Sequence, residues 1–338
     1  MKILFDIRHP AQINFFKHSI KKLSIENEVI VTTIGRGRLP EIVVDAFKKY
    51  PHIKIKTIGK HRGNFLSIVV EANILRFFRL FYFLVRNRPH LVVSVAGFLI
   101  GFGSRLLGID NIQFSDDPEN NKVTKLASLT ANELYVTPNN LNYKSFNSLK
   151  EWAYLSPDYF EPQEDILAAF GLEPYAYIFI REVSTGSLNY SDQNSNTILN
   201  ISRHIPKQIR VVFSLENKKM SSYYPKNWIV LKEPVEDIHS LIYYSRIVIS
   251  SGDSMAREGA LLGVPSIYCG IREMNANNIL IRKGRLFKLS PAEVVPFVRK
   301  IYQNEIHFSK QDVFRNELLH EWIDVNEFII SKINNFKS

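Results

Sequence analysis

Short apolar runs alternate with longer segments of helical periodicity along most of the chain. Such runs, rich in Ile, Val, Leu and Phe, are typical of buried strands in a parallel sheet, and the intervening segments are long enough for crossover helices. The alternation therefore predicts an α/β protein with two doubly wound, Rossmann-like domains. The predicted strands are Ile3–Phe5, Val29–Thr33, Ile53–Ile58, Leu91–Val95, Ile112–Phe114, Leu134–Val136, Tyr177–Ile180, Val211–Ser214, Trp228–Leu231, Ile247–Ser250 and Ser266–Tyr268.

Turn-forming residues displace this alternation between Pro138 and Pro174. We place the domain boundary there, and expect an N-terminal domain over residues 1–155 and a C-terminal domain over residues 156–320. The chain beyond Pro291 has helical periodicity, and its last part, residues 321–338, could pack back onto the N-terminal domain.

The composition removes several classes of protein. Of the 338 residues 45% are hydrophobic, which is enough for two cores and too many for a disordered chain. Cys269 is the only cysteine, so a disulfide framework and a cysteine zinc site are excluded and a reducing compartment is expected. The opening apolar stretch is closed by Asp6, which is not the pattern of a signal peptide. We therefore expect a cytoplasmic protein.

Positive charge is concentrated near the N-terminus. Residues 1–90 hold 17 lysines and arginines against 6 acidic residues, whereas residues 91–338 hold 26 against 27. A basic domain favours an anionic partner, such as a membrane surface, a phosphorylated acceptor or nucleic acid. A basic surface that is merely solvated is the alternative.

The segment from Phe65 to Arg86 is strongly apolar, but polar and charged residues interrupt it. Its longest uncharged stretch after Arg79 is Leu80–Val85, far shorter than the roughly 20 residues that a membrane span needs. At helical spacing Arg76, Arg79 and Arg86 share one side. Either these arginines face anionic lipid from an interfacial helix, or the helix packs on the sheet and they reach out to water.

The strongest motif runs from Ile247 to Tyr268 (IVISSGDSMAREGALLGVPSIY). An apolar strand ends in the turn SGDS, and a helix begins at once. The free amides and the dipole of a helix N-terminus favour a phosphate or diphosphate, so the motif predicts a nucleotide site. Glu258, one turn into the helix, could accept hydrogen bonds from two ribose hydroxyls. Alternatively, Asp253 or Ser254 is a plain N-cap.

This stretch resembles the corresponding segment of UDP-N-acetylglucosamine 2-epimerases and of GT-B glycosyltransferases. It is most similar to an uncharacterised archaeal and bacterial family related to both. The resemblance implies a GT-B fold, with two domains facing a central cleft, and a nucleotide sugar, expected to be UDP-linked, as a substrate with no further cofactor. By position it implies that Glu258 binds the ribose and that the diphosphate turn consists of Ser251, Gly252, Asp253 and Ser254.

Arg181 is a further candidate on the donor side. It follows the strand Tyr177–Ile180 at the carboxyl edge, where ligands bind in doubly wound folds, and could neutralise phosphate. Glu182 could pair with it instead. The segment Leu231–Asp237 stands where GT-B proteins present backbone groups to the base, so the resemblance places a uracil pocket there.

Four residues at strand ends of the N-terminal domain compete for the chemistry. In a GT-B arrangement the loop with His9 faces the cleft, and a histidine can take a proton from an acceptor hydroxyl. Asp6 could hold the imidazole ring, act as the base itself or cap the loop. Asp116 and Asp117 follow the strand Ile112–Phe114 and could serve as base or metal ligand, although Asp-Pro also forms ordinary turns.

Other chemistries lack their motifs. The Walker sequence and the GxGxxG fingerprint are absent, and the histidines show no metal-ligand spacing. We therefore expect no metal site and no dehydrogenase. Cys269 follows an apolar strand and is more typical of a core than of a nucleophile.

The residues and the resemblance together predict a metal-independent glycosyltransferase. It would take a sugar from a nucleotide donor and bind a surface glycan or a lipid-linked acceptor at its basic domain, where peripheral contact with the inner membrane face is an open option. A UDP-sugar 2-epimerase is the alternative, although the epimerases' His-Glu-Ala-Gly pattern is replaced here by Phe114–Asp117. A nucleic-acid-binding protein is supported by charge alone, and we expect no nucleic acid partner.

Overall fold

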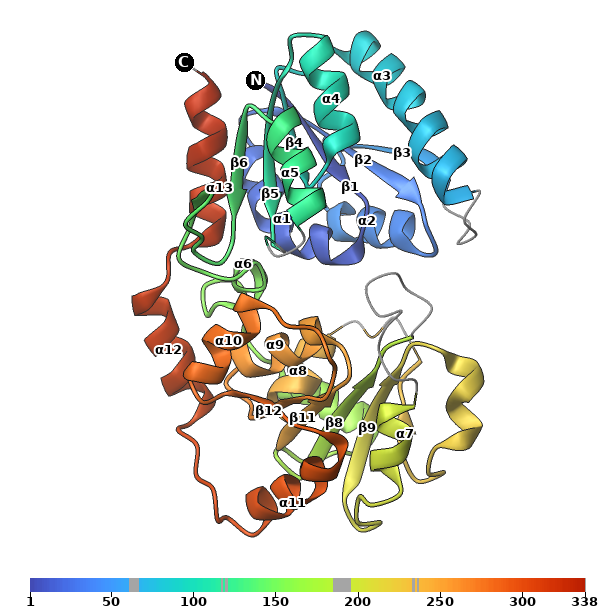
Figure 1. Ribbon diagram of the computed structural model, residues 1–338, viewed down its shortest axis with the longest axis vertical. Helices are drawn as coiled ribbons and strands as arrows, with labels where there is room; N and C mark the ends of the chain where they lie inside the picture. Colours follow the sequence, from blue (N-terminus) through green and yellow to red (C-terminus); the bar gives the residue numbers. More distant parts are fainter. Residues whose placement is uncertain are drawn as a thin grey trace. The chain divides into compact units, whose positions relative to one another are not determined.

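The computed structural model describes residues 1–60, 67–116, 118, 121–184, 196–232, 235 and 237–337. The chain divides into two compact units (Figure 1). Unit 1 comprises Met1–Tyr154 and Trp322–Ser338, and unit 2 comprises Leu155–Glu321. The junctions lie next to the positions expected from the sequence.

Unit 1 is built on a parallel sheet. Within the described residues the sheet has seven strands in the order β3-β2-β1-β4-β5-β6-β7. Each strand predicted for this half of the chain is present, and all except the edge strand β3 have their apolar runs buried. The short β7 is an addition. The strands are β1 (Lys2–Ile7), β2 (Glu28–Gly35), β3 (Lys54–Lys60), β4 (Leu91–Val95), β5 (Asp110–Ser115), β6 (Glu133–Val136) and β7 (Lys144–Ser145).

Helices cover both faces of this sheet. On one face Leu80 and Leu84 of one helix and Ile100 of the next form a buried cluster with Leu4 and Val92 of the strands. The helices of that face are the π-helix η1 (Ser67–Leu75), α3 (Arg76–Asn87), α4 (Phe98–Leu106) and α5 (Asn121–Thr130). The remaining helices of unit 1 are α1 (Pro10–Leu23), α2 (Leu39–Phe47), α13 (Val325–Asn334) and the 3-10 turn η4 (Asn335–Lys337).

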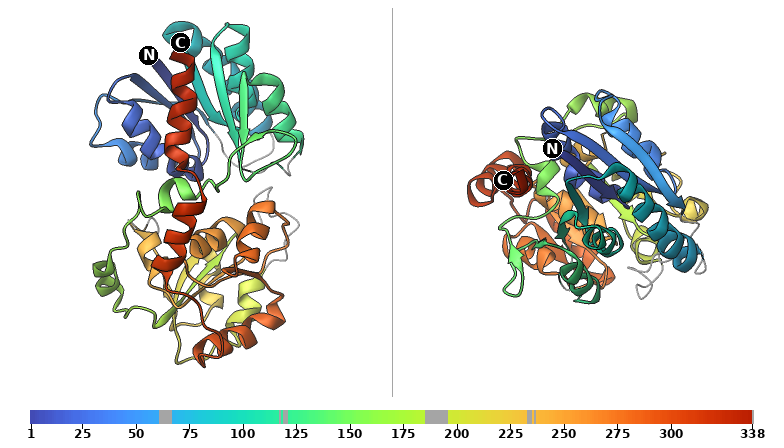
Figure 2. Two further views of the ribbon diagram at one scale, coloured as in Figure 1. Left: turned by 90° about the vertical axis from the view of Figure 1, so that its left-hand side faces the viewer. Right: turned by 90° about the horizontal axis from the view of Figure 1, so that it is seen from above.

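The segment after Glu321 belongs to unit 1. Helix α13 packs against α1, and both are seen side by side with the first strands in Figure 2. The buried Ser19 hydroxyl donates to Asn326 Oδ1 over 2.8 Å, and Asn326 Nδ2 donates to the carbonyl of Ala153 over 2.8 Å. Trp152 and Trp322 also meet edge to face, with centroids 5.7 Å apart. Unit 1 is thus completed by residues from the far end of the sequence.

Unit 2 has a second parallel sheet. Its described strands number six, in the order β10-β9-β8-β11-β12-β13. The predicted strands are all present, and the short β13 is an addition. The strands are β8 (Tyr177–Glu182), β9 (Arg210–Leu215), β10 (Ile229–Val230), β11 (Ile247–Ser250), β12 (Ser266–Tyr268) and β13 (Leu286–Lys288).

Helices of unit 2 also lie on both faces of the sheet. Ile198 and Ile201 pack with Val294 and Val298 into one core cluster with the strands. The elements are η2 (Glu164–Phe170), α7 (Thr197–Ser202), η3 (Lys218–Tyr223), α8 (Ile238–Tyr243), α9 (Asp253–Leu261), α10 (Asn275–Arg282), α11 (Pro291–Tyr302) and α12 (Gln311–Glu321), with α6 (Trp152–Leu155) at the junction of the units.

The two sheets share one topology. In each, the chain runs outward over the first three strands and then returns to the other side of the first strand. The strand order therefore reverses between β1 and β4 in unit 1 and between β8 and β11 in unit 2. In open α/β sheets, ligands bind at the carboxyl ends of the strands beside such a reversal. We call these two places the β1/β4 crevice and the β8/β11 crevice.

Arg76 corrects the sequence interpretation of α3. Only 1% of its surface is exposed, and its guanidinium donates to Asp6 Oδ1 at 2.6 Å and to the carbonyl of Ile58 at 3.1 Å. The expectation that it faces lipid or water beside Arg79 and Arg86 is wrong. Its charge is instead neutralised inside unit 1 by a carboxylate from β1.

Candidate functional site

Ser251 bridges the β8/β11 crevice of unit 2. In the register of the two strands Ser250 lies opposite Arg181. One residue later, the Ser251 amide donates to the carbonyl of Arg181 at 3.1 Å, and the Ser251 hydroxyl accepts the amide of Val183 at 3.0 Å. The hydroxyl therefore fixes the backbone that follows β8, at the edge where a ligand would bind.

Helix α9 begins at this edge with an open first turn. Its N-cap is Gly252, and no side chain of the described residues caps it. The Ser250 hydroxyl folds the turn instead, accepting the amide of Gly252 at 3.0 Å and donating to the carbonyl of the same residue at 2.7 Å. The amides that follow, with the hydroxyl of Ser254 beside them, form the kind of N-terminus that binds phosphate.

Asp253 is committed to arginines inside unit 2. It is 2% exposed, and its Oδ2 accepts from Arg257 at 3.0 Å and from Arg272 at 3.4 Å. Arg257 is equally buried and also donates to Asn277 Oδ1 at 3.0 Å and Ser254 Oγ at 3.4 Å. Asp253 thus organises the turn, and these two guanidinium groups against its single carboxylate add positive charge near the start of α9.

Glu258 meets a histidine that the sequence analysis did not select. Its Oε1 lies 3.5 Å from Nε2 of His239 on α8, and both side chains are largely buried. Helix α8 is fixed there by Asp237, whose Oδ1 accepts the amide of Ser240 at 3.1 Å. The signal that could have found His239 is its place directly after Leu231–Asp237, the segment expected to border the base.

Arg181 lies at the crevice but is held by β9. Its Nη1 donates to Ser214 Oγ at 2.7 Å, and its Nη2 lies 3.7 Å from Glu216 Oε2. Glu216 accepts the amide of Ser184 as well, at 2.8 Å. A phosphate bound at this guanidinium would compete with Glu216 for its positive charge.

Glu182 is the second polar group at the end of β8. Its Oε1 accepts the amide of Ile198 at 3.3 Å, whereas Oε2 is buried and has no hydrogen-bond partner among the described residues. Burial raises the pKa of this carboxyl to about 7. Because Glu182 turns toward α7, it does not pair with Arg181 in the contacts described above.

Cys269 is a core residue, as the sequence predicts. It is 7% exposed, and burial raises the pKa of its thiol to about 12, so the reactive thiolate is disfavoured. It lines a hollow of about 870 Å³ at the ends of β12 and β13, together with Thr197, Lys288 and Ser290.

His9 caps helix α1 in unit 1. Its Nδ1 accepts the amide of Ala11 at 3.2 Å, so the neutral ring carries its proton on Nε2. His9 is exposed, and partial desolvation together with the positive charges of Arg36 and Lys150 lowers its pKa to about 4. In this arrangement His9 is neutral at pH 7 and offers a donor rather than a base.

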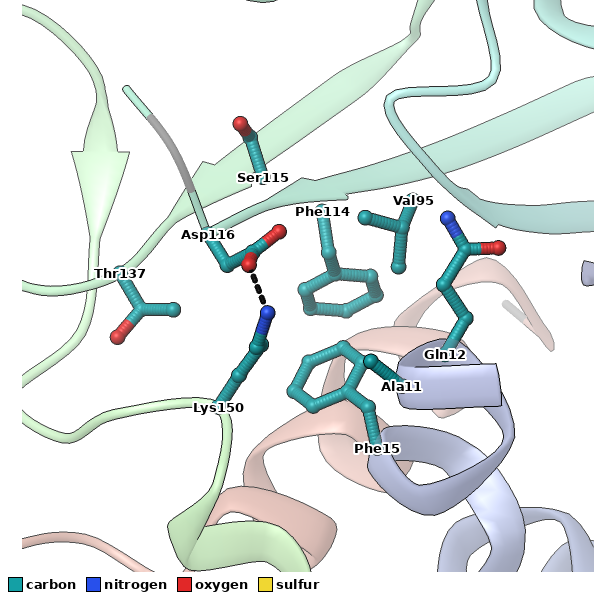
Figure 3. A pocket seen from close by; sticks show the side chains of 9 residues that line it. All are labelled: Ala11, Gln12, Phe15, Val95, Phe114, Ser115, Asp116, Thr137 and Lys150. Carbon is teal, nitrogen blue, oxygen red and sulfur yellow. Dashed lines mark hydrogen bonds and ion pairs between the residues drawn. The ribbon is translucent and has the colours of Figure 1, made fainter. Parts of the chain in front are cut away.

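Asp116 lies near His9, beside a small cavity at the carboxyl edge of unit 1. It forms an ion pair with Lys150, and its charge counteracts the lowering of the His9 pKa. Figure 3 shows the pair beside the rings of Phe15 and Phe114. The cavity has a volume of about 20 Å³ and is lined by Ala11, Gln12, Phe15, Val95, Phe114, Ser115, Asp116, Thr137 and Lys150. Asp117 lies outside the described residues.

Asp6 is not brought together with His9. Its side chain is 1% exposed, and Oδ1 accepts from Thr32 Oγ1 at 2.8 Å and from Arg76 at 2.6 Å. Leu4, two positions earlier on the strand, packs with the α3 cluster, so Asp6 shares that face of the sheet, while α1 covers the other. The carboxylate therefore holds α3 in place.

Arg8 closes the β1/β4 crevice. Its Nη2 donates to the carbonyls of Val95 and Ala96, at 3.2 and 2.8 Å. Ala96 has a left-handed backbone with φ of 46°, a conformation that costs a residue with a Cβ atom about 1 kcal/mol. Burial lowers the pKa of Arg8 from its ordinary value. Arg8 could not be selected from the sequence, because no motif near it indicates that its guanidinium binds two carbonyls more than 80 residues away.

Comparison with known proteins places the chain. Residues 1–319 match the family described as a protein of unknown function, DUF354. The chain belongs to this family. A curated relative, the uncharacterized protein MJ0665 of Methanocaldococcus jannaschii, is 26% identical over 88% of this chain and 91% of its own length.

Solved structures of low sequence identity share the fold. The UDP-GlcNAc 2-epimerase of M. jannaschii has a TM-score of 0.66 at 13% identity, covering 99% of this chain and 100% of its own. The glycosyltransferase VinC in complex with dTDP has a TM-score of 0.64 at 10% identity, covering 100% of both chains. MurG of Acinetobacter baumannii has a TM-score of 0.58 at 14% identity, covering 99% and 100%. The fold is therefore GT-B, and the expected resemblance to both classes is confirmed.

Among the described residues, no helix is long and apolar enough to cross a membrane. The same residues contain no cluster of three or more His, Cys, Asp or Glu side chains that could hold a metal ion.

Proposed function

We propose that this protein is a glycosyltransferase whose unit 2 binds a UDP-linked sugar. The observation that carries the proposal is the open N-terminus of α9 at the β8/β11 crevice, with Glu258 one turn further on. A diphosphate would accept hydrogen bonds from the amides of the first turn and from the hydroxyl of Ser254, while Arg257 and Arg272 offset its charge. Two fold neighbours, VinC in complex with dTDP and the Neisseria meningitidis 2-epimerase bound to UDP-GlcNAc, support a nucleotide as the ligand.

Glu258 would hold the ribose. Its carboxylate can accept from two neighbouring hydroxyls, and the adjacent His239 can orient it through the 3.5 Å contact. The departing diphosphate would be stabilised by the same α9 amides and dipole, so that the leaving group needs no metal ion.

Unit 1 would bind the acceptor and supply the base. Asp116 is the preferred base, because a carboxylate accepts protons while His9 presents an N–H at Nε2. In the transfer step the acceptor oxygen forms a bond to the anomeric carbon and passes its proton to Asp116. The bond from that carbon to the phosphate oxygen breaks, and its electron pair leaves with UDP. His9 would donate to a substrate oxygen. A glycan or a lipid-linked acceptor fits the basic character of the N-terminal residues.

A nucleotide panel tests the donor site. UDP at about 100 times its Kd should stabilise the folded protein by about 2.7 kcal/mol in a thermal-shift series that also contains CDP, GDP, ADP and their sugar conjugates. Glu258→Ala should weaken UDP binding about 100-fold, since two hydrogen bonds to a charged group are lost. Glu305→Ala removes an exposed acid of the same unit and is the matched control. A panel without any stabilising nucleotide would overturn the proposal.

A UDP-sugar 2-epimerase is the second candidate, favoured by the epimerase neighbours of similar TM-score. The two activities differ in one readout. An epimerase converts UDP-GlcNAc into its C2 epimer without an acceptor, which proton NMR of the sugar ring detects. A transferase leaves the sugar configuration of the unreacted donor unchanged.

A further inference from the structure

The outward side of α3, α4 and α5 carries an unusual number of exposed apolar side chains. Phe78 is 63% exposed, Tyr82 64% and Leu106 59%. The three helices pack side by side, as Figure 1 shows. We call this surface the apolar face. Residues of η1 continue this face. Its members are Val70, Ile74 and Leu75 of η1 and, on the three helices, Phe78, Tyr82, Val85, Phe102, Leu106, Leu126 and Leu129.

The inward side of α3 already satisfies the core of unit 1. Leu80 and Leu84 are buried there with the strands, and Phe77 packs its ring 5.8 Å from that of Phe102 on α4. Helix α3 thus has buried apolar side chains toward the sheet and, in Phe78, Tyr82 and Val85, further exposed apolar side chains beside its arginines. An exposed apolar surface of this extent is normally covered by a partner or a membrane, so it is suited to a second apolar environment.

Positive charge surrounds this surface. In the sequence of η1, α3, α4 and α5 the only acid is Glu71, which is paired with Arg79 at 3.2 Å. The arginines and lysines of these helices are exposed, apart from Arg76 inside the unit. They are Arg79, Arg86, Arg105, Lys122 and Lys125.

We propose that the apolar face docks unit 1 on the surface of an anionic lipid bilayer. Helix α3, about 18 Å long at 1.5 Å per residue, would lie flat at the headgroup level, with Phe78 and Tyr82 among the acyl chains. Arg79 and Arg86 would extend to the lipid phosphates. A protein partner would need a matching acidic surface, whereas the anionic leaflet supplies negative charge and an apolar interior together.

The rest of unit 1 provides the contrast. Ile25 and Val44, on the side of α1 and α2, are also exposed. Neither lies next to another exposed large apolar residue along the chain, and single exposed residues of this kind are ordinary for a protein surface. A matched pair of exposed apolar residues outside the apolar face is therefore at hand as a control.

Vesicle flotation without any nucleotide or acceptor tests the proposal. The intact protein should bind vesicles of phosphatidylcholine and phosphatidylglycerol at least about tenfold more strongly than phosphatidylcholine alone, and less as salt rises. The double variant Phe78→Ser/Tyr82→Ser should lose at least about tenfold of this binding. The control Ile25→Ser/Val44→Ser should keep it. Arg86→Gln/Arg105→Gln should bind the anionic vesicles about 30-fold less well.

Two results would overturn the proposal. Equal binding by the Phe78→Ser/Tyr82→Ser variant and the intact protein would remove the apolar face from the contact. Self-association that this variant abolishes, without vesicle binding by the intact protein, would assign the face to a second copy of the chain. Because neither measurement uses a donor sugar, failure here is distinct from failure of the proposed transferase activity.

Discussion

The two crevices have the same topology and opposite contents. At the β1/β4 crevice of unit 1, the Arg8 guanidinium lies at the strand ends and donates to the carbonyls of Val95 and Ala96. At the β8/β11 crevice of unit 2, Arg181 turns aside to β9, and the Ser251 hydroxyl and the open first turn of α9 line the edge. Strand order thus shows where a ligand could bind, and the direction of one arginine decides whether it can.

This difference suggests that the strand ends stabilise the fold in unit 1 and bind a ligand in unit 2. An arginine that is hydrogen-bonded to the strand ends stabilises its own unit, while a crevice that borders a helix N-terminus is suited to an anion. In unit 1 the polar groups suited to chemistry lie instead beside α1, where Asp116 and Lys150 border the small cavity. Variants that disturb each crevice should therefore affect stability and nucleotide binding in different proportions.

The largest effect is expected for Asp253→Ala in unit 2. Removing this carboxylate leaves Arg257, 1% exposed, without its acidic partner, which costs about 3–5 kcal/mol for a buried pair. Hydrogen exchange followed by mass spectrometry should locate the loss of protection in residues 155–321. Asp45→Ala, an exposed acid in unit 1, should change stability by less than about 0.5 kcal/mol. Equal protection of Asp253→Ala and the wild type would show that the turn does not need this ion pair.

A smaller effect is expected for Arg8→Ala in unit 1. The change removes two charged hydrogen bonds to the Val95 and Ala96 carbonyls and should lower the stability of unit 1 by about 2 kcal/mol. The affinity for UDP should stay unchanged, because the proposed nucleotide site lies in unit 2. Isothermal titration and urea unfolding of the same sample measure both quantities. If Arg8→Ala lost as much UDP affinity as Glu258→Ala, the nucleotide would depend on the β1/β4 crevice as well, and its assignment to unit 2 alone would be wrong.

The smallest effect concerns the pH dependence of unit 1. The pKa of His9 is about 6.5 in the unfolded chain and about 4 in the folded protein. Between these pH values the unfolded chain binds the proton and the folded protein does not, so the free energy of unfolding falls as the pH drops. His9→Asn keeps a side chain that can cap α1 but does not titrate. The variant should therefore lose about 1 kcal/mol less stability than the wild type as the pH falls, a difference kept small by solvent screening at the exposed ring. Urea unfolding at about pH 5 and about pH 7 provides the comparison. His18, whose pKa is lowered to about 4 by burial, should maintain a residual dependence in the variant.

Most of the fold follows from the apolar runs. Buried parallel strands leave a strong pattern, and each predicted strand is present in the sheets. The strands β7 (Lys144–Ser145) and β13 (Leu286–Lys288) escaped prediction because they are short and lie at the sheet edges, where neither length nor a continuous apolar run distinguishes them.

The sequence could not predict which distant side chains pair with one another. Arg76 has the spacing of a surface arginine, and only the buried Asp6, 70 residues earlier, explains its place inside the unit. His239 and Glu258 likewise come from different helices that the sheet brings together. The motif identified the residues of the α9 turn, but it could not show that Asp253 is already occupied by Arg257 and Arg272.

The return of α13 to unit 1 has a consequence for synthesis on the ribosome. Residues 1–154 emerge first, but the Trp322 ring and the Asn326 amide that complete their packing follow only after the whole of unit 2 has been made. Unit 2 is therefore the first part with all its own residues available. The nascent first half must keep the α1 side of its sheet partly uncovered while more than 160 further residues are translated, a period in which chaperone contact would be most useful.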